Sequence, residues 1–342
     1  MLTLSTDLLY SYLLIFSTGK KTFENMGRSI EKSGDTVSRS LLQTSQTLAE
    51  VRSIAIRALG EKKEIKMLTD HSIVRKMFAQ CMEGTWPLYD GVLGKCVNGY
   101  RWFVVLLVCG DVAFPWECKF DLPKELASEN DETWLQTIQR IYADVQINFP
   151  KSRVTIVADG AFATTAMVDW GVKSRLKVEM RMHKNRRVVY RGISSKISEI
   201  KELIPKGRHF ARTIQVLWHG NIISITAQRR INKHGDETIV YQIATYEAKP
   251  SLHVQTYKQR WLIEESFRRC KQIFGVQDCA STSFEKQCNH TAAVLLAYSL
   301  TQLERVIGKH DRIEDAIRAL KSMDFNTMAL RLNALNQNLR KS

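Results

Sequence analysis

The spacing of apolar residues along the chain predicts alternating strands and helices. A nearly continuous apolar run at 101–109 (RWFVVLLVC) is typical of a strand buried on both faces, and residues 112–120, after a Gly-Asp turn, predict its hairpin partner. A short strand at 66–69 precedes this hairpin. After it, apolar residues at helical spacing predict a helix over 125–148, and residues 153–158 (RVTIVA) predict another buried strand. This order of elements predicts an α/β fold.

The second half of the chain changes character twice. A helix at 161–170 and a strand at 176–182 continue the α/β pattern. Residues 186–250 are basic and contain short strand-like runs, which predict a β-rich insertion. From His253 to the end the pattern is helical. The strand-like runs of the insertion are 188–191, 213–218, 221–227 and 238–245.

The N-terminal region is predicted to be helical. Its first apolar run, 8–16, is too short to span a bilayer and lacks the layout of a signal peptide, so we interpret it as a core helix. A helix at 23–32, a break at Ser33-Gly34 and a second helix at 35–44, which Asp35 would cap, resemble a helix-turn-helix. A plain helical hairpin is the alternative interpretation.

These patterns divide the chain into five parts. The order strand, hairpin, helix, strand is the opening of an RNase H-like fold, so the core of the chain is expected to have that architecture. The expected parts are a helical N-terminal DNA-binding region (1–62), the first part of the core (63–185), the β-rich insertion (186–250), the rest of the core (251–305) and a C-terminal helical tail (306–342).

Composition and charge narrow the function. The 342 residues include 44% hydrophobic residues with 17 glycines and 6 prolines, which indicates a folded protein. Lys and Arg number 50 against 35 Asp and Glu, a net charge of +15 that favours a polyanionic partner such as nucleic acid. The seven cysteines contain no CxxC pair and the histidines no HxxxH pair, so neither a zinc site nor a disulfide framework is expected. The chain is expected to be cytoplasmic and nucleoid-associated, with no membrane partner.

Two aspartates follow predicted strands and are candidates for chemistry. Asp70 comes after 66–69, and Asp159 comes after 153–158. In an open α/β sheet, ligand sites lie at the carboxyl ends of strands. A lone Asp in such a place is more often a turn or a helix cap, but a pair of them with a third carboxylate downstream suits phosphodiester chemistry, which uses two hard cations bound by carboxylate oxygens.

The third carboxylate lies in a segment without Pro or Gly, 257–271 (YKQRWLIEESFRRCK), which predicts one helix. At about 100° per residue, Tyr257, Glu264 and Lys271 fall within about 40° of one another, and Arg260 and Arg268 lie near the same stripe. One face would therefore present a carboxylate flanked by cations and a phenol. A solvated face with intrahelical salt bridges is the alternative.

Four residues of this segment, and two segments around the aspartates, resemble motifs of a known protein family. Tyr257, Arg260, Glu264 and Lys271 fit the pattern Y-x2-R-x3-E-x6-K, the signature of bacterial insertion-sequence DDE transposases. The segments 154–163 (VTIVADGAFA) and 68–72 (LTDHS) resemble the regions around the two aspartates of that family. The resemblance covers about residues 64–305.

The resemblance implies a site and its cofactors. Asp70, Asp159 and Glu264 would be the catalytic residues and the ligands of two Mg²⁺ or Mn²⁺ ions. Tyr257, Arg260, Lys271 and Arg268 would contact DNA. Relatives use an aromatic side chain of the insertion to hold a flipped base, and Trp218 is the candidate here.

The resemblance also implies the reaction and the partners. The chain would cleave DNA at transposon ends and join them to target DNA, acting on terminal inverted repeats as a homodimer in a synaptic complex. The sequence departs from the family at His71, where many relatives carry an acid, so Glu83 and Asp90 remain less favoured substitutes for the first carboxylate. A nuclease of the same fold without strand transfer, and a decayed transposase that only binds DNA, are the alternative functions.

Overall fold

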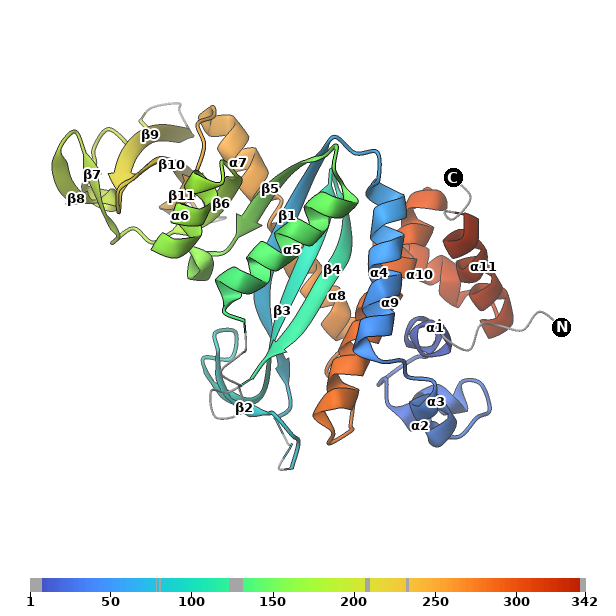
Figure 1. Cartoon of the computed structure of the whole chain (residues 1–342). Helices are drawn as coiled ribbons and strands as arrows, with labels where there is room; N and C mark the ends of the chain where they lie inside the picture. The colour runs from blue at the N-terminus through green and yellow to red at the C-terminus, as the bar shows by residue number, and fades with distance from the viewer. Residues whose placement is uncertain are drawn as a thin grey trace. The chain divides into compact units, whose positions relative to one another are not determined.

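The structure is a computed structural model, which describes residues 8–77, 79, 81–122, 132–206, 210–231 and 234–338 (Figure 1). The chain forms two compact units whose segments alternate along the sequence. We call residues 63–70 and 132–263 the sheet unit, and residues 1–62, 71–131 and 264–342 the helical unit. Two elements contribute to both units, since strand β1 (Glu64–Arg75) and helix α8 (Trp261–Gln272) each contain a boundary.

The sheet unit contains one mixed sheet. Its order is β1-β5-β6-β11-β10-β9-β7-β8, in which β5 pairs with β1 and β6 in parallel and the remaining pairs are antiparallel. The turn between β9 and β10 is His219-Gly220, and both residues have positive φ angles (47° and 83°), as a two-residue hairpin turn requires. Besides the first part of β1, the strands are β5 (Arg153–Ala158), β6 (Lys177–Met182), β7 (Arg187–Tyr190), β8 (Ile193–Lys196), β9 (Ala211–Trp218), β10 (Asn221–Ile231) and β11 (Glu237–Ala244).

Three helices belong wholly to the sheet unit. α5 (Trp134–Asn148) begins with a capping box between Thr133 and Gln136, and its buried residues recur at helical spacing. α6 (Thr165–Lys173) follows β5 after a 3₁₀ turn, Gly160–Phe162. α7 (Pro250–Lys258) begins with a proline at its first position, and it packs on β6, β9, β10 and β11. A second 3₁₀ turn, Ile197–Glu199, follows β8.

The helical unit is organised around α9 (Phe284–Ile307). α9 packs on α1, α4, α10, α11 and β4, and it is buried almost all round from Gln287 to Glu304. A helix that is buried on nearly every side is expected at the centre of its unit. The other helices are α1 (Leu9–Phe16), α2 (Phe23–Arg28), α3 (Gly34–Arg39), α4 (Thr44–Leu59), α10 (Ile313–Lys321) and α11 (Phe325–Asn338).

The helical unit also contains a long hairpin. β3 (Lys95–Cys109) pairs with β2 (Trp86–Asp90) through its first residues and with β4 (Val112–Asp121) through its later ones, and in the strand order it lies between β2 and β1. Residues 102–107 of β3 are fully buried, as the continuous apolar run predicted. The hairpin thereby supplies much of this unit's core.

The predicted α/β fold class is confirmed, and most elements lie where the sequence placed them. The buried strand 153–158 matches β5, and the helix expected at 8–16 is α1, with most of its side chains buried. The strand expected at 66–69 is wrong in length, because β1 continues to Arg75 by joining the hairpin of the helical unit. The expected start of the 125–148 helix lies partly outside the described residues.

Two further predictions are wrong. Ser33, rather than Asp35, caps α3 by accepting a hydrogen bond from the Thr36 amide, and Asp35 lies in the first turn. The single helix expected over 257–271 is two helices, because backbone bonds of the i→i+3 type tighten the chain at residues 259–263 between α7 and α8.

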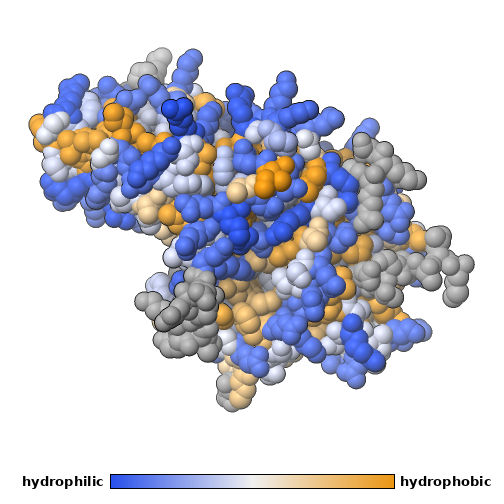
Figure 2. Space-filling model, in the orientation of Figure 1, coloured by the Kyte–Doolittle hydropathy of each residue, from blue (hydrophilic) through white to orange (hydrophobic). Residues whose placement is uncertain are grey.

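Hydrophilic side chains dominate the face in Figure 2, with apolar ones scattered between them. The β-rich part of the sheet unit exposes several large apolar side chains, namely Ile193, Phe210, Leu217, Ile222 and Ile231. Among the helices in the described ranges, none is long and apolar enough to cross a membrane.

Candidate active site

The sheet unit brings Asp70 and Asp159 to the same end of one parallel ladder. The β1–β5 pairing ends where Thr69 lies opposite Ala158, and the two aspartates are the next residues of their strands. Register partners in a parallel pair share a face, and neighbouring strands lie about 5 Å apart. The sheet therefore places both carboxylates side by side, although Asp70 lies inside β1 rather than at its end.

The junction between α7 and α8 contacts β1 through two side chains. Arg260 donates a hydrogen bond from Nη1 to Oδ2 of Asp70 at 2.6 Å, and both side chains are mostly buried, with 15% and 16% exposed. The adjacent Gln259 accepts a hydrogen bond from the Nζ of Lys66. Lys66 and Asp70 are four residues apart on a strand and so share a face. These two contacts place the signature arginine beside the first aspartate.

Tyr257 lies close to the same carboxylates. Its side chain is buried, and the Arg260 guanidinium lies 5.8 Å from the centre of its ring. Burial is the main reason that the pKa of Tyr257 rises to about 12, the Arg260 charge opposes the rise, and Asp159 and Asp70 add to it. Its hydroxyl has no hydrogen-bond partner among the described residues. A protonated phenol is therefore available as a donor beside the two acids.

A buried polar cluster fixes α7 on the sheet. Glu179 of β6 accepts hydrogen bonds at Oε1 from the Tyr246 hydroxyl and, at 2.8 Å, pairs with Nδ1 of His253. Glu179 and His253 are each 1% exposed. Burial first, and then the neighbouring Glu179 charge, raises the pKa of Tyr246 above its usual value. Since His253 and Tyr257 are one helical turn apart on α7, this cluster sets the position of the signature tyrosine.

Sequence reasoning missed Glu179 and His253. Glu179 stands between the apolar residues Val178 and Met180 of β6 (KVEMRM), and a carboxylate buried with them must have a partner. That pattern was visible in the sequence, but the partner, 74 residues away, was not.

The remaining signature residues belong to the helical unit. Glu264 lies in the first turn of α8 and is exposed, and Lys271 lies in its last turn. Arg268 is paired with Glu265 at 2.7 Å and with Glu314 at 3.4 Å. The salt bridges of Arg268 are therefore with carboxylates of its own unit.

Asp70 and Asp159 fit a divalent cation by their donor chemistry. Carboxylate oxygens are the ligands that Mg²⁺ and Mn²⁺ prefer, and two adjacent carboxylates can share one ion. In the described ranges, no three His, Cys, Asp or Glu side chains form one metal-binding group. The sheet unit thus supplies two of the three acids that the sequence predicted as metal ligands.

Other candidates have structural roles. Asp90 is buried and accepts a hydrogen bond from Arg75 Nε, which is the main reason that its pKa is lowered. Glu83 accepts a hydrogen bond at 2.9 Å from the Phe284 amide at the start of α9. Trp218 is 3% exposed and packs edge-on against His219, and its role in holding a base stays a prediction.

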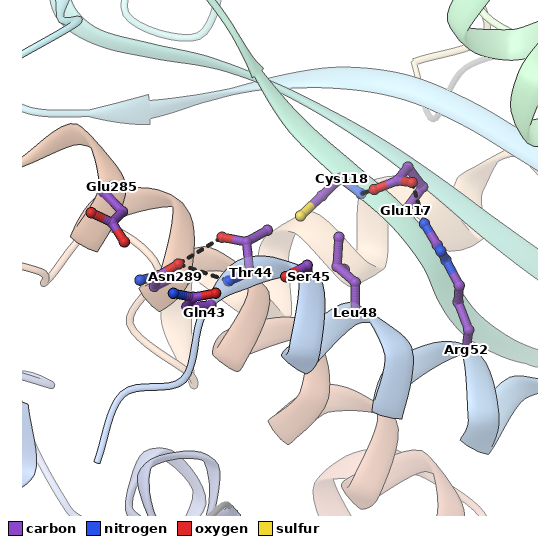
Figure 3. Close-up of a pocket in the computed structure, with 9 residues that line it drawn as sticks. All are labelled: Gln43, Thr44, Ser45, Leu48, Arg52, Glu117, Cys118, Glu285 and Asn289. Carbon is purple, nitrogen blue, oxygen red and sulfur yellow. Dashed lines mark hydrogen bonds and ion pairs between the residues drawn. The ribbon is translucent and has the colours of Figure 1, made fainter. Parts of the chain in front are cut away.

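A cavity of about 580 Å³ in the helical unit is lined by residues of α4, β4 and α9 (Figure 3). The Asn289 side chain accepts hydrogen bonds from the backbone and hydroxyl of Thr44, which connects α9 to the start of α4. On the other side, Arg52 pairs with Glu117. Each of these two pairs joins two elements of the unit, which is a structural role.

Comparison with known proteins identifies one family. The family model described as "Transposase DDE domain" matches residues 121–300, slightly more than half of the chain. That range includes Asp159, Tyr257, Arg260, Glu264 and Lys271. None of the curated proteins matches the chain.

Proposed function

The chain belongs to the transposase DDE domain family, and from this premise we propose that it cleaves DNA at the ends of a transposable element and transfers those ends to target DNA. Membership of this family indicates that the chain is an enzyme that acts on DNA. The proposal adds the two reactions and the residues that perform them. The observation that supports it best is the placement of Asp70 and Asp159 at the end of one parallel ladder, with Arg260 on Asp70.

Asp70, Asp159 and Glu264 would hold the divalent ions that such transposases typically use. When bound, the ions supply charge stabilisation for an in-line displacement at phosphorus. The acids themselves need only be ionised and held close together. The backbone ladder brings the first two side by side.

The surrounding cations and phenol would position the DNA. Arg260 presents a planar fork that suits a phosphate, and its contact with Asp70 keeps it next to the reacting centre. Tyr257 keeps its proton at neutral pH, since its pKa is about 12, and so it donates a hydrogen bond to a phosphate oxygen. Lys271 adds a further positive charge along the DNA. These residues contribute positioning and charge neutralisation.

The chemistry consists of two displacements at phosphorus. In the first, a water oxygen bonds to the phosphorus at the end of the element, the bond to the 3′ oxygen breaks, and that oxygen takes a proton. In the second, this 3′ hydroxyl loses its proton and attacks a phosphodiester of the target, releasing a 3′ hydroxyl of target DNA. Both entering and leaving oxygens belong to water or DNA, so no covalent protein intermediate is required.

The partners follow from this chemistry. Terminal inverted repeats and target DNA are the substrates, and pairing two ends calls for a homodimer. In this proposal residues 63–185 and 251–305 form the catalytic core, residues 186–250 its insertion, residues 1–62 a DNA-binding region and residues 306–342 a helical tail.

The test uses the full-length protein and a duplex containing the DNA that flanks the gene. We expect nicking at the element's end with Mg²⁺ and none after chelation, and strand transfer when a target plasmid is added. Glu264→Ala should abolish cleavage and leave end binding intact, whereas the matched variant Glu265→Ala should cut. Cleavage by Glu264→Ala at the wild-type rate would contradict the assignment. Cleavage without joining would indicate a nuclease, and binding without cleavage by the wild type would indicate a decayed enzyme.

A further inference from the structure

The helical unit contains a second cavity, of about 870 Å³, whose charge is mainly positive. Three segments line it: the stretch between α1 and α2, the end of α8 with the loop that follows, and α10. Signature residue Lys271 is one of its lining residues. The cationic side chains of this basic pocket are Lys20, Lys21, Lys271, Arg318 and Lys321.

The two acids of the basic pocket are already engaged. Asp278 accepts a hydrogen bond at 2.8 Å from the Lys21 amide, and Glu314 accepts one at 2.9 Å from Arg269 Nε outside the lining. In the described part of the chain, Lys20, Lys271 and Lys321 have no salt bridge within 4.0 Å. Arg318 pairs with Asp315, so the positive charge that the described part of the unit leaves without a salt bridge includes Lys20, Lys271 and Lys321.

Bringing these cations close together in the folded unit is unfavourable in free energy. Lys21 is 2% exposed, and burial, followed by the nearby Lys321, lowers its pKa to about 8. Burial also lowers the pKa of Lys271, with Arg75 adding to the effect, and that of Lys321. Burial of like charges together is unfavourable unless an anion offsets it. An anionic ligand in the pocket would remove that penalty.

The backbone at Gly275 approaches the Lys21 side chain closely. Gly275 has a φ of +66°, and a Cβ atom there would lie 2.4 Å from Lys21 Cγ and 2.5 Å from an Asp278 carboxylate oxygen. Only glycine allows this approach. On α10, positions 314, 318 and 321 follow helical spacing beside the buried stripe of 313, 316, 317 and 320, so Arg318 and Lys321 face the same side.

We propose that the basic pocket binds backbone phosphates of the same DNA end that Lys271 contacts, which extends the DNA-binding surface to Lys20 and α10. This inference rests on the proposed function. Lys271 and Lys321 both lie in the last turn of a helix, where a cation is favourable without any ligand. Lys21 is explained in the same way, because its Nζ donates a hydrogen bond to the carbonyl of Ser17, the C-cap of α1. That role does not explain Lys20, which lies in a segment without helix or strand. Lys271, which the proposed function assigns to DNA contact, lines this pocket, so DNA is the polyanion expected there.

The test is equilibrium binding of the full-length protein to an end-containing duplex over a range of salt concentrations. The double variant Lys20→Ala/Lys321→Ala should bind about tenfold or more weakly at moderate salt, and the slope of log K against log salt should fall by about 2, since each phosphate contact contributes about 0.9. Lys20→Arg/Lys321→Arg should keep the wild-type slope. Lys95→Ala, which removes an exposed lysine of the same unit outside the pocket, should also keep it.

Lysine acetylation with a small amine-reactive ester gives an independent readout. Bound DNA should protect Lys20 and Lys321 and leave Lys95 reactive. An unchanged slope in Lys20→Ala/Lys321→Ala, together with unprotected lysines, would overturn the inference while Lys271→Ala still weakens binding. A wild-type protein that does not bind the duplex at all would overturn the proposed function as well. Matching thermal unfolding of the variants and the wild type shows that a loss of binding is not a loss of folding.

Discussion

In the sheet unit, two carboxylates lie side by side at the end of a parallel ladder, whereas in the helical unit, five cations surround one cavity. The carboxylates are positioned by the backbone, because register alone sets Asp70 beside Asp159. The cations are positioned by packing of three distant segments, and Lys21 is buried at a cost in free energy. Substitutions of the two carboxylates should therefore change the rate of DNA cleavage. Substitutions of the five cations should change the affinity for DNA.

The largest expected effect is on the carboxylate side of this comparison. Asp159→Asn keeps the shape of the side chain and removes its charge. We expect cleavage of an end-containing duplex to fall by about 10³-fold or more, which is about 4 kcal/mol of transition-state stabilisation, with DNA affinity unchanged. Single-turnover cleavage and anisotropy measure the two quantities. Loss of binding in step with loss of cleavage would remove the distinction between the two groups.

The next effect concerns the cluster that holds α7 on the sheet. His253→Ala removes one of the two hydrogen-bond partners of the buried Glu179 and leaves Tyr246 as the other, and breaking a buried pair in this way costs up to about 3–5 kcal/mol. We expect earlier thermal unfolding and faster hydrogen exchange in α7. The double variant His253→Leu/Glu179→Leu, which removes both partners, should recover part of the loss. Equal destabilisation in both variants would show that the pair contributes by packing alone.

A third effect depends on pH and belongs to the helical unit. His290 is fully buried between the Tyr10 hydroxyl (2.7 Å) and the Gly275 carbonyl (3.0 Å), and burial lowers its pKa to about 4. Above about pH 6.5 both folded and unfolded states carry a neutral ring, and its contribution to stability is complete. As pH falls from 6.5 to 4 the unfolded state binds a proton first, so the free energy of unfolding falls by up to about 1.4 kcal/mol per pH unit.

Denaturant titrations between pH 4.5 and 7.5 measure this dependence. The variant His290→Gln cannot titrate, so its stability should be lower but its slope with pH shallower than that of the wild type. An identical slope would show that other groups account for the acid sensitivity of the helical unit.

The smallest effect is expected for a single cation. Lys271→Ala should weaken binding to an end-containing duplex by about tenfold, about 1.4 kcal/mol, and reduce the salt slope by about 0.9. Cleavage at saturating protein should change less than binding. A defect in cleavage alone would place Lys271 with the chemistry rather than with the binding surface.

The sequence predicted most of what depends on short-range pattern. Residues 153–158 are apolar enough to be a strand in any buried context, and the structure confirms it. The split at residues 259–260 was not predictable, because it accompanies contacts of Gln259 and Arg260 with β1 almost 200 positions earlier. The basic pocket was hidden for the same reason, since Lys20 and Lys321 meet only in the folded unit.

Iron-directed cleavage of the polypeptide tests the central assignment most directly. Fe²⁺ takes the place of Mg²⁺ at carboxylate sites, and with ascorbate and peroxide it generates radicals that cut the backbone near the bound ion. We predict cuts near residues 70 and 159 that disappear with excess Mg²⁺ and in Asp159→Asn. Cuts that persist in Asp159→Asn, or that fall only elsewhere in the chain, would contradict the assignment of these two aspartates as metal ligands.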